Sequence, residues 1–132
     1  MYLAHGLFQI TIKNNLLILD AEGPFNLEYV NKLIDSIAQL APHMQQNWGQ
    51  LTIFHNDSIF VPEAFNAVKE SMKTRKSDGL KCMAIVLVEA QCSFIIKNQI
   101  TEIYQSTSLP FEFFESNEQA EQWLRDMLQS NH

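Results

Sequence analysis

Residues 82–88, CMAIVLV, form the most apolar run of this 132-residue chain, and they decide its fold. A continuous apolar run is typical of a strand that is covered on both faces of a sheet. The run therefore predicts a central, buried strand, and it requires helices on the sheet to cover it.

Four more strands are predicted on either side of this run. Leu7–Ile12 and Phe111–Phe113 alternate between apolar and polar residues, whereas Leu16–Leu19 and Leu51–Phe54 are largely apolar. Residues 13–15, Lys-Asn-Asn, predict a tight turn between the first two strands, because asparagine tolerates left-handed dihedral angles. These two strands should therefore be antiparallel.

Apolar residues at helical spacing predict four helices. Asn26 suits the N-cap of the first helix, and Pro42 ends it. Pro62 suits the first turn of the second helix, and Gly79 its C-terminal end. Ser116 begins a capping box for the last one. The predicted helices contain residues 26–41, 62–78, 94–103 and 116–127.

Strands joined by helices become parallel neighbours through right-handed crossovers. The predicted fold class is therefore α/β, as a single domain over residues 1–132 in the order β-β-α-β-α-β-α-β-α. Its mixed sheet has five strands, with strand 1 antiparallel and helices packed on the sheet.

Composition narrows the function classes. The formal net charge of −6 disfavours nucleic acid as a partner, because an acidic chain repels phosphate. Cys82 and Cys92 form no C-x-x-C motif, which favours reduced thiols and a cytoplasmic location. The sequence shows no signal-peptide pattern and no apolar stretch of membrane-spanning length, so neither a signal peptide nor a membrane span is expected.

Three segments and their order resemble the STAS domain, the fold of bacterial anti-sigma-factor antagonists. Residues 15–23 (NLLILDAEG) are similar to its second strand, which ends in a glycine, and residues 79–85 (GLKCMAI) to its glycine-ended second helix and fourth strand. Residues 111–120 (FEFFESNEQA) are similar to its last strand and helix. Residues 118–124 (EQAEQWL) are close to the uncharacterised bacterial SpoIIAA-like branch. The resemblance implies a regulatory binding protein.

The chain departs from this family at the start of the second helix. Regulatory members carry Asp-Ser-Ser-Gly there, and a kinase phosphorylates a serine, whereas this chain has residues 60–64, FVPEA. Ser58 lies earlier, so a turn serine that bonds its own backbone is favoured over a phosphorylation switch. Glu63 either places a fixed charge near the missing phosphate or complements the helix dipole.

Polar side chains gather at the predicted carboxyl ends of the parallel strands, where open α/β sheets bind ligands. Catalysis is one interpretation, but it needs acid and base groups held close together, and no such motif is recognisable. The four histidines are isolated, no metal-ligand spacing exists, and no cofactor is predicted. The polar residues at these ends are Asp20, Glu22, His55, Asn56, Asp57, Glu89 and Gln91.

Two further features are candidates for a binding surface: a basic segment, and apolar residues beyond those that the helix faces need. Residues 69–81 hold five of the nine basic residues, which indicates a solvated helix face or a surface that attracts an anionic headgroup. Phe60, Val61 and Phe94 lie near loops and indicate core packing, a pocket or a subunit interface. The five basic residues are Lys69, Lys73, Arg75, Lys76 and Lys81.

The function that these patterns favour is a non-catalytic regulatory or ligand-sensing module that binds a protein partner. The alternative is a carrier or sensor of a small amphipathic, lipid-like ligand, and an enzyme using Asp20, His55, Asp57 and Glu89 is a third class. Homodimer formation stays open. The expected binding residues are His55, Asn56, Asp57, Ser58, Phe60, Glu63 and Lys69.

Overall fold

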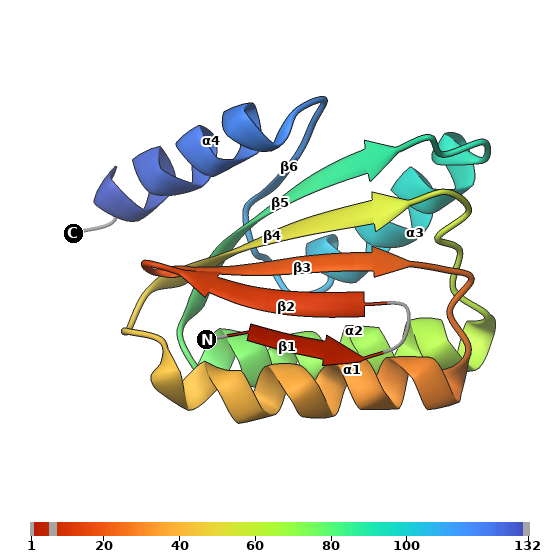
Figure 1. The fold of residues 1–132 in the computed structure, drawn as a ribbon, viewed down its shortest axis with the longest axis horizontal. Helices are drawn as coiled ribbons and strands as arrows, with labels where there is room; N and C mark the ends of the chain where they lie inside the picture. The colour runs from red at the N-terminus through yellow and green to blue at the C-terminus, as the bar shows by residue number, and fades with distance from the viewer. Residues whose placement is uncertain (1, 6–7, 131–132) are drawn as a thin grey trace.

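One mixed sheet with helices on both faces organises the protein (Figure 1). A computed structural model describes residues 2–5 and 8–130, with side chains from residue 8 onward. In this part of the chain six strands follow one another across the sheet in sequence order. The strands are β1 (Tyr2–His5), β2 (Phe8–Lys13), β3 (Leu16–Glu22), β4 (Trp48–His55), β5 (Leu80–Val88) and β6 (Phe111–Phe114).

The predicted fold class is confirmed. Strands β2 to β6 are the five predicted strands, β2 runs antiparallel to β3, and β3 to β6 are parallel. Strand β1 is an addition, since it pairs antiparallel with β2 and forms the sheet edge. Its four residues carry no clear apolar alternation, so the sequence did not predict it. Leu7, predicted to begin the first strand, lies outside the described residues.

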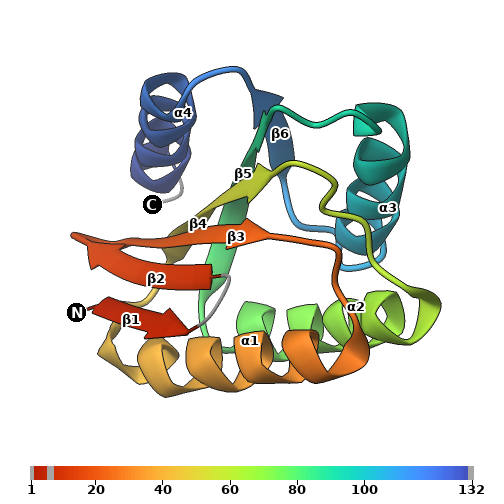
Figure 2. The ribbon, with the colours of Figure 1, turned by 45° about the vertical axis from the view of Figure 1, so that its right-hand side comes forward.

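The helices divide between the two sheet faces (Figure 2). One apolar cluster packs α1, α2 and α3 on one face, and a smaller cluster packs α4 alone on the other. Strand β5 contributes Met83 and Ile85 to the first cluster and Cys82 and Ala84 to the second, so its prediction as a buried central strand is confirmed. The helices are α1 (Leu27–Leu40), α2 (Pro62–Ser77), α3 (Ser93–Gln105) and α4 (Asn117–Ser130), with a short 3-10 helix η1 (Ala41–His43).

The helix signals in the sequence act as predicted. The side chain of Asn26 accepts a hydrogen bond from the Tyr29 amide at 2.8 Å and caps α1. Ser116 accepts one from the Gln119 amide at 3.2 Å ahead of α4. Gly79 follows α2 with φ +111°, a backbone conformation that residues with a Cβ atom rarely adopt.

We expect Asn26→Ala to lower the free energy of unfolding by about 1 kcal/mol, because an N-cap hydrogen bond is lost. Urea unfolding followed by circular dichroism measures the change. Asn66→Ala is the matched control, since Asn66 is exposed inside α2 and alanine is the better helix former. Equal stability of wild type and Asn26→Ala would contradict the capping role.

Candidate functional site

The carboxyl ends of β3, β4 and β5 meet at one edge of the sheet, where the loops before α1 and α2 are joined by backbone hydrogen bonds (Figure 1). The Phe25 amide donates to the Ile59 carbonyl at 2.8 Å, and the Val61 amide donates to the Phe25 carbonyl at 3.0 Å. This parallel bridge between Phe25 and Phe60 extends the pairing of the sheet into the loops. The loops therefore hold a defined shape.

Buried Ser58 joins the same two loops through hydrogen bonds of its side chain. Its hydroxyl donates to the His55 carbonyl at 2.8 Å and accepts from the Gly23 amide at 3.1 Å, and the residue has no exposed surface. Gly23 has no room for a side chain, since an added Cβ would lie 2.6 Å from the Ser58 Cα. The hydroxyl makes the local backbone bond that the turn-serine interpretation predicts, and burial keeps it from a kinase in the folded state.

Gln99 of α3 ties the loop before α2 to a third element. Its side-chain amide donates to the Phe60 carbonyl at 2.9 Å, and its oxygen accepts from the Phe60 amide at 3.0 Å. The Phe60 ring stacks on Phe25 with 4.6 Å between ring centroids, in the main core. Phe60 is therefore a core residue with 5% of its surface exposed, as the core-packing interpretation predicts.

Apart from the buried Ser58, the other expected binding residues are at least partly exposed. His55 lies 2.8 Å from Asp20, measured from Nε2 to a carboxylate oxygen. Asn56, Asp57 and Glu63 are exposed, and Asn56 has φ +56°. Lys69 Nζ lies 3.6 Å from the Glu102 carboxylate, farther along the helices. His55, Asn56, Asp57 and Ser58 are consecutive in the chain. Among the described residues, no hydrogen bond or ion pair joins Glu63 or Lys69 to them.

The structure pairs two of the four residues of the acid–base constellation. Asp20 and His55 are paired, but in the described part of the chain neither Asp57 nor Glu89 forms an ion pair with them. Among the same residues no group of three His, Cys, Asp or Glu side chains is arranged to hold a metal ion.

Exposed apolar side chains surround this edge, at the N-terminal ends of α1, α2 and α3. Phe94 is 76% exposed, which is unusual for a phenylalanine. Val61 follows the bridge between Phe25 and Phe60, and Leu27 lies two residues beyond Phe25. Ile95 lies one helical turn before Gln99, which bonds Phe60. We call this set the apolar rim, and it consists of Leu27, Val61, Phe94 and Ile95.

A surface recess of about 510 Å³ opens beside the apolar rim, at the carboxyl ends of β5 and β6. It is lined by Glu89, Ser93, Lys97, Phe113 and Glu115, among others, and Ser93 is the neighbour of Phe94 in the chain. The Lys97 ammonium lies 5.5 Å from the centre of the Phe113 ring. The two carboxylates outweigh the one cation, so the recess favours a cationic group.

The basic segment is not one solvated face, and that interpretation is wrong for Arg75. Arg75 is 8% exposed and points into the interface between α2 and β4. Lys76 donates to the Thr107 carbonyl at 2.8 Å, and Lys73 pairs with Glu70 at 3.3 Å. Of the five basic side chains, Lys81 is an exposed strand residue.

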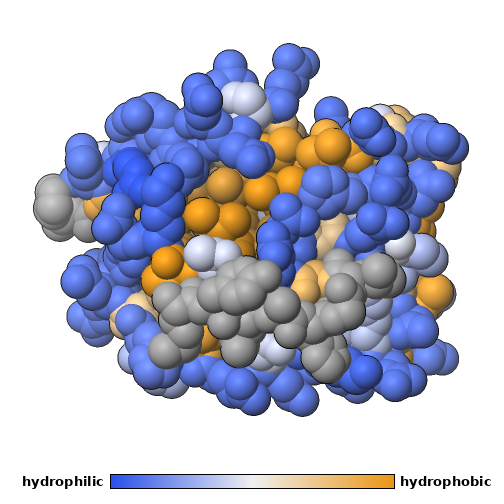
Figure 3. Space-filling model, viewed as in Figure 1, coloured by the Kyte–Doolittle hydropathy of each residue, from blue (hydrophilic) through white to orange (hydrophobic). Residues whose placement is uncertain are grey.

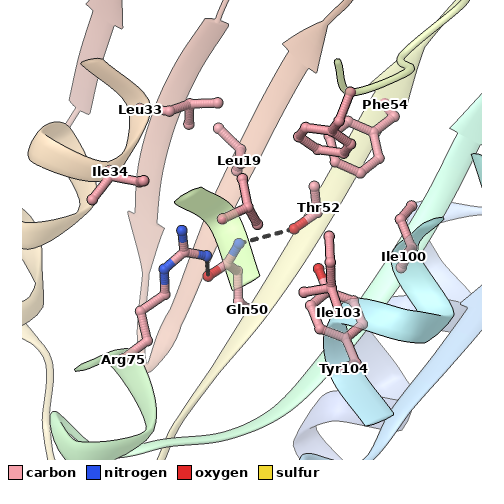
Figure 4. Close-up of a pocket in the computed structure, with 12 residues that line it drawn as sticks. Leu19, Leu33, Ile34, Gln50, Thr52, Phe54, Arg75, Ile100, Ile103 and Tyr104 are labelled. Carbon is pink, nitrogen blue, oxygen red and sulfur yellow. Dashed lines mark hydrogen bonds between the residues drawn. The ribbon is translucent and has the colours of Figure 1, made fainter. Parts of the chain in front are cut away.

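Arg75 belongs to a buried row of polar side chains between the sheet and the helices (Figure 4). Arg75 donates to the Gln50 side chain at 3.4 Å, and Gln50 donates to Thr52 at 2.9 Å. Thr52 hydrogen-bonds the Tyr104 phenol. We call this set the buried polar row, and it consists of Gln50, Thr52, Arg75 and Tyr104.

Sequence reasoning missed the buried polar row, although the sequence contained a signal. Gln50 and Thr52 lie two residues apart, hence on one face of a strand whose neighbours are covered on both faces. Arg75 continues the helical spacing of Phe65, Val68 and Met72, the predicted inner face of α2. The position of Arg75 on the inner face of α2, more than its residue type, predicts that its side chain is buried.

Burial changes the ionisation of three groups. It lowers the pKa of Arg75 to about 10, so the guanidinium stays charged at neutral pH. It raises the pKa of Tyr104, which therefore stays neutral. Burial also raises the pKa of the Cys82 thiol to about 11, which removes the thiolate that a nucleophilic cysteine needs.

The sheet face under α4 is incompletely covered. Figure 3 shows apolar side chains in a hollow between α4 and the strands at the sheet edge. Partly buried Ile18, Val88 and Phe114 pack against the smaller core cluster there.

Comparisons with protein-family models, with curated proteins and with solved structures find no match to this chain. The resemblance to the STAS domain therefore stays a prediction. None of the helices formed by residues 8–130 combines the length and apolarity needed to cross a membrane.

We expect Ser58→Ala to lower the free energy of unfolding by about 1–3 kcal/mol, because it leaves a buried amide and a buried carbonyl without their partner. Ser58→Asp should be more disruptive, because it buries a charge. Urea unfolding measures both, with exposed Ser77→Ala as the control. A stable Ser58→Asp protein would show that this position tolerates a phosphoserine-like charge.

We expect a thiol reagent to modify Cys92 rapidly and Cys82 only on unfolding, because Cys92 is half-exposed and Cys82 is buried with a raised pKa. Absorbance after addition of an aromatic disulfide counts the thiols in the native state and in guanidinium chloride. Cys92→Ala should abolish the rapid phase, and Cys82→Ala should keep it. Rapid modification of Cys82 in the native state would contradict its burial.

Proposed function

We propose that the protein is a non-catalytic binding module of STAS-like architecture, and that it recognises a protein partner through the apolar rim. Exposure of Phe94 together with Val61, Leu27 and Ile95 is the observation that carries this proposal. Aromatic and aliphatic side chains exposed together on a surface are typical of protein–protein contacts.

A fixed backbone supports the same proposal. Ser58, Gln99 and the bridge between Phe25 and Phe60 hold the loops that carry the rim. A surface that is ordered before binding loses less conformational entropy on association, which strengthens the complex. The loop after β4 thus supports the binding surface, and the side chains of the apolar rim contact the partner.

Charge beside the rim indicates the chemistry of the partner. Glu89 and Glu115 line the recess next to Phe94, with Lys97 as its cation. A partner segment with an apolar anchor and an adjacent lysine or arginine complements both features. In this complex the apolar rim would bury the apolar anchor of the partner, and the recess would orient its basic side chain.

A carrier of a small amphipathic ligand is the second candidate. An apolar cavity between the sheet and α1 to α3, with Arg75 at its wall, favours it. The cavity is about 30 Å³, which is room for about one or two water molecules. An acyl chain would require the helices to separate, so protein binding is the better supported function.

Site-specific photo-cross-linking in living cells tests the proposed function. We expect a photoreactive phenylalanine at position 94 to give a discrete protein adduct, and the same group at exposed Gln129 of α4 to give none. The adducted protein, purified, should then bind Phe94→Ser at least about 10-fold more weakly than wild type, because a buried aromatic anchor is lost.

Leu128→Ser, which changes a half-buried apolar residue of α4, should leave that affinity unchanged. Identical adducts at positions 94 and 129, or equal affinities of wild type and Phe94→Ser, would rule out the rim as the recognition surface.

A further inference from the structure

Arg75 is a buried cation without a buried anion. Its guanidinium has two hydrogen bonds to neutral side-chain oxygens, at 3.4 Å to Gln50 and at 3.1 Å to Ser71. No carboxylate in the described part of the chain lies within 4.0 Å of it. An arginine has five N–H donors, so donors and the whole positive charge are left over.

The surroundings make this charge expensive. Tyr104, which interacts with Arg75, is neutral because burial raises its pKa. The other walls near the guanidinium include Leu19, Leu33 and Ile34 (Figure 4). Burying a charge among apolar side chains costs several kcal/mol unless a counter-charge is present. A bound anion would offset part of this cost.

Two cavities meet at Arg75. The inner cavity, of about 30 Å³, lies between the sheet and the helices, and Gln50, Thr52 and Tyr104 line it together with apolar side chains. The outer cavity, of about 80 Å³, lies between α1 and α2. Arg75 and Ile34 line both, so the two cavities adjoin at these side chains.

The outer cavity gives access from solvent. Ala38, Thr74 and Asp78 in its walls are exposed. The full lining is Ile34, Ile37 and Ala38 of α1, Ala41 after it, Ser71, Thr74 and Arg75 of α2, and Asp78 after that helix. Asp78 is the acidic residue of this set, and it is exposed, so solvent screens its repulsion of an anion. The outer cavity therefore lies next to solvent on one side and next to Arg75 on the other.

We propose that these two cavities form a binding site for a small monoanion, either a halide or the carboxylate group of a short aliphatic acid, with Arg75 as its main ligand. The inner space limits the charged group to about the size of one or two water molecules. The apolar walls disfavour strongly hydrated dianions such as sulfate, and they accommodate a short aliphatic tail. This site is separate from the apolar rim and does not depend on the proposed protein partner.

Thermal unfolding at constant ionic strength tests the site. Sodium chloride, acetate or butyrate replaces sodium gluconate, whose anion is too large for the cavities. We expect at least one of the three small anions to raise the Tm of wild type saturably, by about 5–10 °C at a hundredfold excess over its Kd. Chloride alone would identify a halide site, and a larger effect of butyrate than of acetate would identify an acid with an apolar tail.

Arg75→Met removes the charge and keeps an apolar stem, and it should abolish the saturable rise. Arg125→Met on α4, on the other sheet face, is the matched control and should keep it. An equal rise in Arg75→Met and wild type, or no saturable rise in wild type with any of the three anions, would overturn the proposal.

Crystals of the wild-type protein soaked in sodium bromide give a second readout that does not depend on the folding of Arg75→Met. We expect an anomalous peak at hydrogen-bond distance from the Arg75 guanidinium nitrogens. Bromide peaks confined to the protein surface would overturn the halide form of the site, and an acetate or butyrate soak without density at Arg75 would overturn the carboxylate form.

Discussion

Burial of β5 on both of its faces is the constraint on which the rest of the structure depends. Met83 and Ile85 face α1 to α3, whereas Cys82 and Ala84 face α4. A strand of this kind needs a neighbour on each side and helices on both faces, and the helical crossovers then make β3 to β6 parallel. The carboxyl ends of β3, β4 and β5 consequently come to one edge, where the loops and the apolar rim lie.

Helix α2 connects the two candidate sites that follow from this arrangement. Val61, its N-cap, belongs to the apolar rim, and Arg75, near its C-terminal end, belongs to the buried polar row. Its 16 residues span about 24 Å, so the two sites lie at opposite ends of one rigid element. An anion that changes the packing of α2 against α1 would act on the element that also carries part of the rim.

Local signals in the sequence predicted the fold well, and long-range contacts account for what it did not predict. Asn26, Pro62 and Ser116 act at helix ends through neighbours a few residues away, so their roles follow from the sequence alone. The hydrogen bonds between Gln99 and Phe60 join residues that are 39 positions apart in the sequence. No periodic pattern in the sequence predicts such a pair. Arg75 was misplaced because its charge was given more weight than its position on the inner face of α2.

Helix α4 covers its sheet face without help from the other three helices. Gly49 allows this close approach, since an added Cβ there would lie 3.2 Å from Leu124 and 3.1 Å from Leu16. During synthesis, the strands that α4 covers are complete before residues 117–130 have been made. A ribosome-bound chain that stops short of α4 therefore presents Leu51, Cys82 and their neighbours as a bare apolar surface, which is the kind of surface that chaperones bind.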